Sequence, residues 1–180
     1  MNNLLLFIML VLMLWDNIYS QNSLKEISDI SLSPVDAFEK YCARCHGYEG
    51  ADYEKEFEEL TEEKLKTFVE DMMFGPASLN PTGIEIEAMT AYNKSIQNKK
   101  PFAAALNSKS FLEGKDRNLI INISPGSEIY VSEKEKIKIE KEEKIWKLFY
   151  NYEKISKLKI IVKRNSVISS FIFPDELWCK

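Results

Sequence analysis

The residue pattern of this chain changes near residue 106, and this change constrains the fold more than any other feature. Before that point, apolar residues recur every three or four positions, as in helices that bury one face. After it, short runs of β-branched and aromatic residues alternate with turn residues. We therefore predict an α+β protein, with a small all-α domain at residues 33–106 and a small antiparallel β-rich domain at residues 107–180.

Three helices are expected in the first part, because each has a recognisable start. Ser33-Pro34-Val35-Asp36 offers an N-cap serine and a proline at the first helical position, and the helix runs into Cys42. Thr61 begins the second helix, which ends at Phe74-Gly75-Pro76. Thr82 has a glutamate three residues later, the spacing of a capping box, and begins the third helix.

The second part is predicted to form a small antiparallel β-sandwich or sheet. Its candidate strands are residues 119–123, 128–131, 137–139, 145–149, 158–162 and 167–171. The charge-dense segment 133–144 is expected to form a hairpin with a solvated face, or a surface that docks an acidic partner such as the acidic half of this chain.

Charge is divided unevenly between the two parts. Residues 21–105 carry nine basic and 16 acidic side chains, a net charge of −7, whereas residues 106–180 carry 15 basic and 11 acidic side chains, a net of +4. This asymmetry indicates two units with different surfaces. It does not indicate nucleic-acid binding, because the basic half is also rich in glutamate.

The first 20 residues are expected to be a signal peptide. Leu4 to Trp15 is an apolar run of 12 residues, shorter than the ~20 that span a bilayer as a helix, and Ser20 offers a small residue for cleavage. We expect residues 21–32 to form an N-terminal arm of a periplasmic or otherwise exported protein. If the segment is not cleaved, it anchors the chain to a membrane.

Cys42-Ala43-Arg44-Cys45-His46 is the motif that carries chemistry. C-x-x-C-H is typical of the attachment site of a c-type haem. Two thiols three positions apart can reach one porphyrin, and the following imidazole can bind its iron. We predict one covalent haem c, bound through Cys42 and Cys45, with His46 as the proximal iron ligand.

Cysteines at this spacing also occur in three other kinds of site. A thioredoxin-like pair normally follows a strand, but here a helix is expected before the motif. A structural zinc ion needs four ligands and would require every cysteine, including Cys179, together with the single histidine. A plain disulfide between Cys42 and Cys45 remains an alternative.

The sixth iron ligand is expected to be a methionine. Because His46 is the only histidine, two histidines of this chain cannot both ligate the iron. Met72, Met73 and Met89 lie outside the signal segment. Met89 has core spacing and Met72 continues the apolar stripe of the second helix, so we favour Met73, with Met72 next. An open sixth site is the alternative.

Residues 33–106 resemble the class I cytochrome c family. The similarity lies in Phe38 four positions before Cys42, in the run Cys42–Gly47, and in residues 85–92, which look like the family's C-terminal helix. The resemblance implies an all-α shell around the haem and single-electron transfer between redox partner proteins. It also implies that the first and last helices cross, with Phe38 against Met89 or Tyr92.

An electron carrier or a subunit of a redox complex is therefore expected rather than a stand-alone enzyme, with the β-rich part as a docking or spacer domain. Two alternatives remain open. One is a haem enzyme or ligand sensor with an open sixth site, and the other is a binding protein whose activity lies in the β-rich part. Cys179 is expected to be a packed thiol, or else an intermolecular disulfide or a distal ligand.

Overall fold

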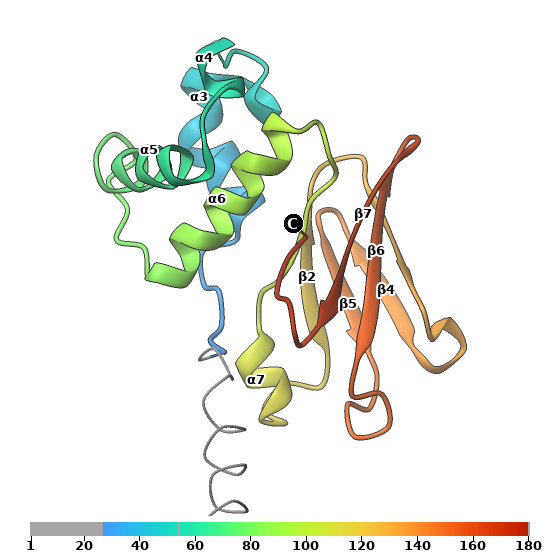
Figure 1. Ribbon diagram of the computed structural model, residues 1–180. Coiled ribbons are helices and arrows are strands. Elements are labelled where there is room, and N and C mark those ends of the chain that lie inside the picture. Colours follow the sequence, from blue (N-terminus) through green and yellow to red (C-terminus); the bar gives the residue numbers. More distant parts are fainter. Residues whose placement is uncertain (1–26, 54, 180) are drawn as a thin grey trace, which may run out of the picture.

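The computed structural model describes residues 27–53 and 55–179, and the side chains of residues 55 and 56 are not described (Figure 1). The predicted signal peptide, and the predicted arm as far as residue 26, lie outside this range. Within it, helices precede antiparallel sheets, which confirms the α+β class. No helix in the described part of the chain is long and apolar enough to cross a membrane.

The helical part comprises one long broken helix, two further helices and short turns; labels follow Figure 1. Its elements are α2 (Pro34–Ala37), the π-helical turn η1 (Phe38–Cys42), α3 (Ala43–His46), the 3₁₀ turn η2 (Tyr48–Gly50), α4 (Lys55–Glu58), α5 (Glu62–Phe74) and α6 (Gly83–Gln97). All three predicted helix starts are confirmed. The Ser33 hydroxyl accepts the backbone N–H of Asp36, Thr61 caps α5, and Thr82 opens the capping box of α6.

The segments α2, η1 and α3 follow one another without a gap, and η1 supplies a wide turn in the middle. The backbone N–H of Ala43 donates to the carbonyl of Phe38, five residues earlier, instead of to the carbonyl four residues earlier. Gly47 ends the helix with φ of 70°, a conformation that glycine adopts without strain. Single π turns inside helices are frequent at functional sites, and this one lies directly before the Cys42–His46 motif.

Two antiparallel sheets form the second part. The first has the order β1-β2-β5-β4 and the second the order β3-β6-β7. The strands and their short helices are β1 (Ala103–Ala105), α7 (Ser108–Leu112), β2 (Leu119–Ile123), β3 (Glu128–Val131), η3 (Lys134–Lys136), β4 (Lys138–Glu142), β5 (Ile145–Phe149), β6 (Leu158–Arg164) and β7 (Val167–Phe173). Apolar side chains from both sheets share one core, so the predicted sandwich is confirmed. Strands β4 and β5 form a hairpin that includes most of segment 133–144.

Strand β1 is the wall between two apolar cores. Ala103 and Ala105 belong to the core of the sandwich, whereas Ala104 belongs to the core of the helical part. This division follows from the alternation of side chains along a strand. Strand β1 was not expected from the sequence, and it lies before the expected start of the β-rich part at residue 107.

Polar contacts join the helical part to the sandwich. The side-chain oxygen of Asn122 on β2 accepts the backbone N–H of Val35 at 3.2 Å, which satisfies a free donor at the start of α2. Lys144, at the β4–β5 turn, pairs with Glu39 and lies 3.6 Å from Asp36. One cation of the segment 133–144 therefore contacts the acidic helical part.

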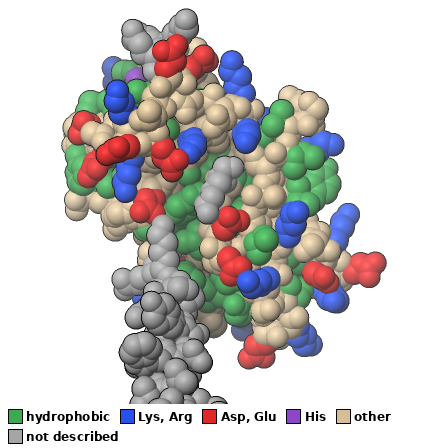
Figure 2. Space-filling model, viewed as in Figure 1, with side chains coloured by type: hydrophobic (Ala, Val, Ile, Leu, Met, Phe, Trp, Pro, Cys, Tyr) green, Lys and Arg blue, Asp and Glu red, His purple; other side chains and the backbone are tan. Residues whose placement is uncertain are grey.

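The residues that lead into α2 also pack on the rest of the molecule. Ile30 is buried, and its backbone N–H donates to the carbonyl of Leu106 at 2.6 Å. The backbone N–H of Leu32 donates to the Glu85 carboxylate at 2.7 Å. On the face shown in Figure 2, acidic and basic side chains are interspersed on the helical part, and on the sandwich side chains of both charges lie among apolar ones.

Candidate functional site

The Cys42–His46 motif occupies the last turn of the broken helix, as the sequence predicted. Cys42 is half-buried and packs against the helical core, Cys45 is exposed, and His46 is half-buried. The described cysteines, Cys42, Cys45 and Cys179, are all free thiols, so Cys42 and Cys45 form no disulfide with each other. Both thiols are thus available for covalent chemistry.

His46 lies among aromatic rings. Its ring centre is 4.7 Å from that of Tyr53, with the planes tilted by 33°, and 6.3 Å from that of Phe68. The Nε2 atom of His46 is buried and has no hydrogen-bond partner among the described residues. Leaving a buried polar atom unpaired costs about 1–3 kcal/mol, and such atoms are rare in folded proteins. This atom therefore marks a position where a ligand or ion can bind.

A small cavity beside His46 brings together the predicted ligand candidates. Its volume is about 10 Å³, the space of one water molecule. Its lining residues are Cys42, His46, Tyr53, Phe68, Val69, Met72, Met73, Met89 and Asn93. The same cavity is thus lined by the three predicted methionines, by the His46 imidazole and by the Cys42 thiol. Cys45 is outside this set and faces solvent.

The packing predicted for the two methionines of α5 is wrong. The buried face of α5 consists of Leu65, Val69 and Met73, which are four residues apart and pack in the helical core. Met73 is only 1% exposed, whereas Met72 is half-buried at the edge of the cavity. The spacing in the sequence allowed either row of the helix to face the core, and the packing of α5 on α6 selects the row that contains Met73.

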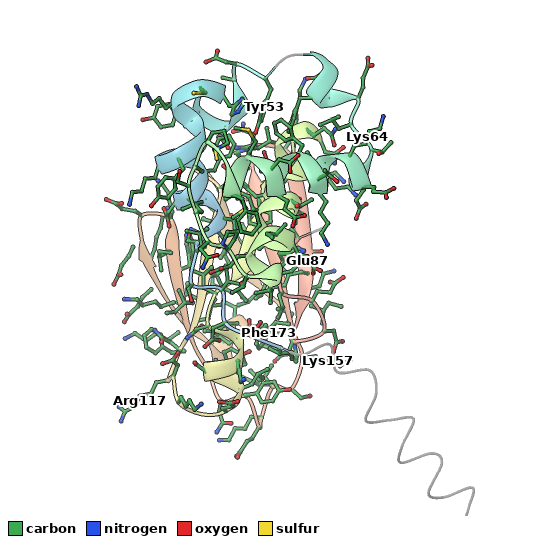
Figure 3. All side chains as sticks on the ribbon, turned by 90° about the vertical axis from the view of Figure 1, so that its left-hand side faces the viewer. Tyr53, Lys64, Glu87, Arg117, Lys157 and Phe173 are labelled. Atoms are coloured by element: carbon green, nitrogen blue, oxygen red, sulfur yellow. The ribbon has the colours of Figure 1, made fainter. Side chains whose placement is uncertain are left out.

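The ring of Tyr53, from the loop after the motif, lies against His46. Tyr53 and Phe57 stack with ring centres 3.6 Å apart and planes 10° from parallel. The Tyr53 hydroxyl donates to the Asn93 side-chain oxygen at 2.6 Å, which ties this loop to α6. Figure 3 shows Tyr53 at the end of the molecule opposite to Arg117 and Lys157.

Tyr53 and Asn93 lie at the site although neither was expected there from the sequence. Asn93 has a detectable signal, because it is a polar residue on the apolar stripe of the third helix and is 3% exposed. Its amide nitrogen donates to the carbonyl of Met89 at 2.9 Å, which leaves its oxygen free for Tyr53. Tyr53 has no such signal, since it lies in a loop of mixed composition.

Burial controls the ionisation of the groups around the cavity. Burial raises the pKa of the Cys42 thiol, and the nearby Cys45 charge raises it further. Burial also raises the pKa of the Tyr53 phenol. Both groups are therefore neutral at neutral pH in the folded chain. Cys42 reacts as a nucleophile only after it loses its proton, because the thiolate is the reactive form.

The third cysteine lies in a different part of the molecule. Cys179 is 3% exposed and belongs to the sandwich core, and its backbone N–H donates to the carbonyl of Ala103 at 3.0 Å. Over the described residues, no three or more His, Cys, Asp or Glu side chains are grouped so as to hold a metal ion. The described chain also has no strand before β1, so the motif follows a helix and not a strand.

Comparisons with known proteins found no match to this chain among models of protein families, curated proteins or solved structures.

Proposed function

We propose that the protein is an exported cytochrome that carries one covalent c-type haem and transfers single electrons between redox partner proteins. The observation that supports this most is the Nε2 atom of His46, which is buried without a partner in a cavity shared with Cys42 and three methionines. The apolar N-terminal run supports export. The resemblance of residues 33–106 to the class I cytochrome c family supports electron transfer as the activity.

The residues at the cavity fit the proposed group by their donor atoms. A free imidazole nitrogen and methionine thioethers are ligands of haem iron, and free thiols three positions apart suit attachment to a porphyrin. The cavity of about 10 Å³ admits nothing larger than water. A porphyrin would fit only if side chains that line the cavity moved.

Each residue then has a defined task. Cys42 and Cys45 would hold the porphyrin through thioether bonds, His46 would ligate the iron through Nε2, and Met73 or Met72 would supply a second ligand. When bound, the haem iron would supply reversible one-electron oxidation and reduction. Val69 and Met89 would add apolar side chains to the lining of the site.

Helix packing is in line with the resemblance. The ring of Phe38 meets the ring of Tyr92 edge-on, with centres 5.5 Å apart and planes at 84°, so the expected contact between the first and last helices is present. Phe38 and Tyr92 are both fully buried. We propose that the helical part is a small all-α haem domain and that the sandwich is its docking or spacer domain.

The attachment is tested with single cysteine variants made in a host that matures c-type cytochromes. Cys42→Ser and Cys45→Ser are each expected to retain one thioether bond at most, so their haem becomes extractable into acidic organic solvent or is lost. Cys179→Ser is the matched control, because this thiol lies in the sandwich core, and it should retain haem that resists extraction. Equal haem content and equal resistance to extraction in all three variants would contradict the proposal.

The sixth ligand is tested with Met72→Leu, Met73→Leu and Met89→Leu. Either Met73→Leu or Met72→Leu should remove the weak sulfur–iron absorption band near the red end of the visible spectrum, and the variant that does so identifies the ligand. Retention of the band in all three variants would contradict a methionine ligand. A wild-type iron that is five-coordinate and binds carbon monoxide would favour the ligand-sensor or enzyme alternative over electron transfer.

A further inference from the structure

A second, larger cleft is lined by residues of the helical part and of the sandwich, and by residues near the C-terminal end of the chain. Its volume is about 430 Å³, within the range of small-molecule sites in proteins. α5 and α6 contribute one wall, β7 contributes Ser169, and the end of the chain contributes Trp178 and Cys179. None of its lining residues belongs to the His46 cavity, so the two sites are separate.

The cleft is at the open side of the sandwich. β7 is an edge strand of its sheet, and residues 177–179 pair with β1 at the edge of the other sheet. Opposite them, α6 presents Thr90, Ala91 and Ser95, whose side chains are small. Small side chains on the helix and a gap between two sheet edges leave room for a ligand.

One polar group in the cleft has no partner. Ser169 is 8% exposed, and its Oγ is buried without a hydrogen bond to any described residue. The other two hydroxyls of the cleft bond to their own helix. Thr90 donates to the carbonyl of Ile86 at 2.8 Å and Ser95 to the carbonyl of Tyr92 at 2.7 Å. Ser169 is thus a buried hydroxyl in the cleft that a ligand can pair.

The charges of the cleft favour an anion. Lys94 pairs with Glu62, and Lys66 lies 3.9 Å from Glu87, so these charges balance. Lys100 has no ion pair with another residue of the described chain, and its backbone N–H donates to the carbonyl of Ser95 at 2.9 Å. The ammonium group of Lys100 is therefore a positive charge at the cleft with no ion-pair partner among the described residues.

We propose that this cleft binds a small organic anion with a flat apolar body, such as an aromatic carboxylate. Lys100 neutralises the carboxylate, the half-buried indole of Trp178 packs on the ring, and Ser169 hydrogen-bonds a polar atom of the ligand. The proposal is independent of the haem, because it uses none of the residues that would hold that group.

The test uses phenylacetate as the probe and the full mature chain, with binding followed by calorimetry and ligand-observed NMR. Phenylacetate should bind with saturation, and its uncharged and cationic analogues, benzyl alcohol and benzylamine, should bind more weakly. Absence of saturable phenylacetate binding, or equal binding of the three probes, would overturn the proposal. Neither result affects the proposed function, which is read from covalent haem.

Matched variants locate the binding. Ser169→Ala should weaken phenylacetate binding about fivefold, the value of one hydrogen bond, and Lys100→Gln should weaken it by at least as much. The controls Ser170→Ala and Lys99→Gln alter the neighbouring residues, which are outside the cleft lining, and should leave binding unchanged. If Ser169 were structural, Ser169→Ala would lower the free energy of unfolding. We expect no such loss, because the variant removes an unpaired buried hydroxyl.

Discussion

Phe38 offers the sharpest test of how the helical core supports the candidate site. Its side chain is fully buried, and its ring lies edge-on to Tyr92 at 5.5 Å and 6.2 Å from Tyr53. Its carbonyl accepts the hydrogen bond that closes the π turn before Cys42. Truncation of this side chain therefore removes its ring contacts with Tyr92 on α6 and with Tyr53.

The expected cost follows from this burial. Phe38→Ala should lower the free energy of unfolding by about 4 kcal/mol, the middle of the range for buried phenylalanines cut to alanine. Phe38→Leu keeps most of the apolar volume and loses the edge-on ring contact, so its cost should be about 1 kcal/mol. Tyr48→Ala is the control, because Tyr48 is 76% exposed, and it should change stability by less than about 0.5 kcal/mol.

Urea unfolding followed by far-ultraviolet circular dichroism measures these costs. With a slope of about 2 kcal/mol per molar urea, Phe38→Ala should lower the unfolding midpoint by about 2 M. A shift as small as that of Tyr48→Ala would refute the reasoning, because it would mean that the buried contact between Phe38 and Tyr92 contributes nothing to stability.

Three further predictions concern the caps, the contact between the two parts and the pH dependence. Ser33→Ala removes the N-cap of α2 and should cost about 1 kcal/mol in the same urea assay, whereas no loss would contradict the cap. A double-mutant cycle of Lys144→Gln and Glu39→Gln should give a coupling energy of about 1 kcal/mol that falls at high salt, and zero coupling would show that the pair is not formed in solution. Burial raises the pKa of Cys179 from 9.0 to about 12, so the thiol stabilises the fold below pH 9 and this contribution is lost as the pH rises towards 12. Compared with Cys179→Ala, the wild type should therefore lose about 2 kcal/mol more between pH 8 and about pH 10.5, and parallel pH profiles of the two proteins would contradict this.

Features of the fold that depend on local chemistry were predictable from the sequence. Helix starts at Ser33, Thr61 and Thr82 follow from side chains that bond to the backbone within three residues. The strands after residue 106 follow from β-branched residues and turn signals. The position of the Cys42–His46 motif at a helix end was also predictable, because the motif comes at the end of the helix that Ser33 begins.

Features that depend on distant partners were not predictable. Strand β1 is three alanines, which carry no strand signal. It pairs with β2 and with residues 177–179, and these partners lie far away in the sequence or beyond an intervening helix. The hydrogen bond of Asn122 to Val35 joins residues 87 positions apart. The choice of Met73 over Met72 for the core depends on how α5 packs on α6, and periodicity alone does not specify it.

The aromatic cover of the site illustrates the same limit. Tyr53 reaches His46 because Asn93, 40 residues later, holds its hydroxyl. A loop sequence contains no information on which distant side chain will fasten it. Asn93 is recognisable in the sequence as a polar residue on an apolar helix face, whereas Tyr53 lies in a loop and has no such signal.

Intact-mass measurement of the exported chain, made in a host that matures c-type cytochromes, tests covalent haem attachment directly. We expect a polypeptide whose mass is increased by one haem, and an unmodified mass for the Cys42→Ala, Cys45→Ala double variant. A wild-type chain that is colourless and has the mass of the bare polypeptide would contradict it.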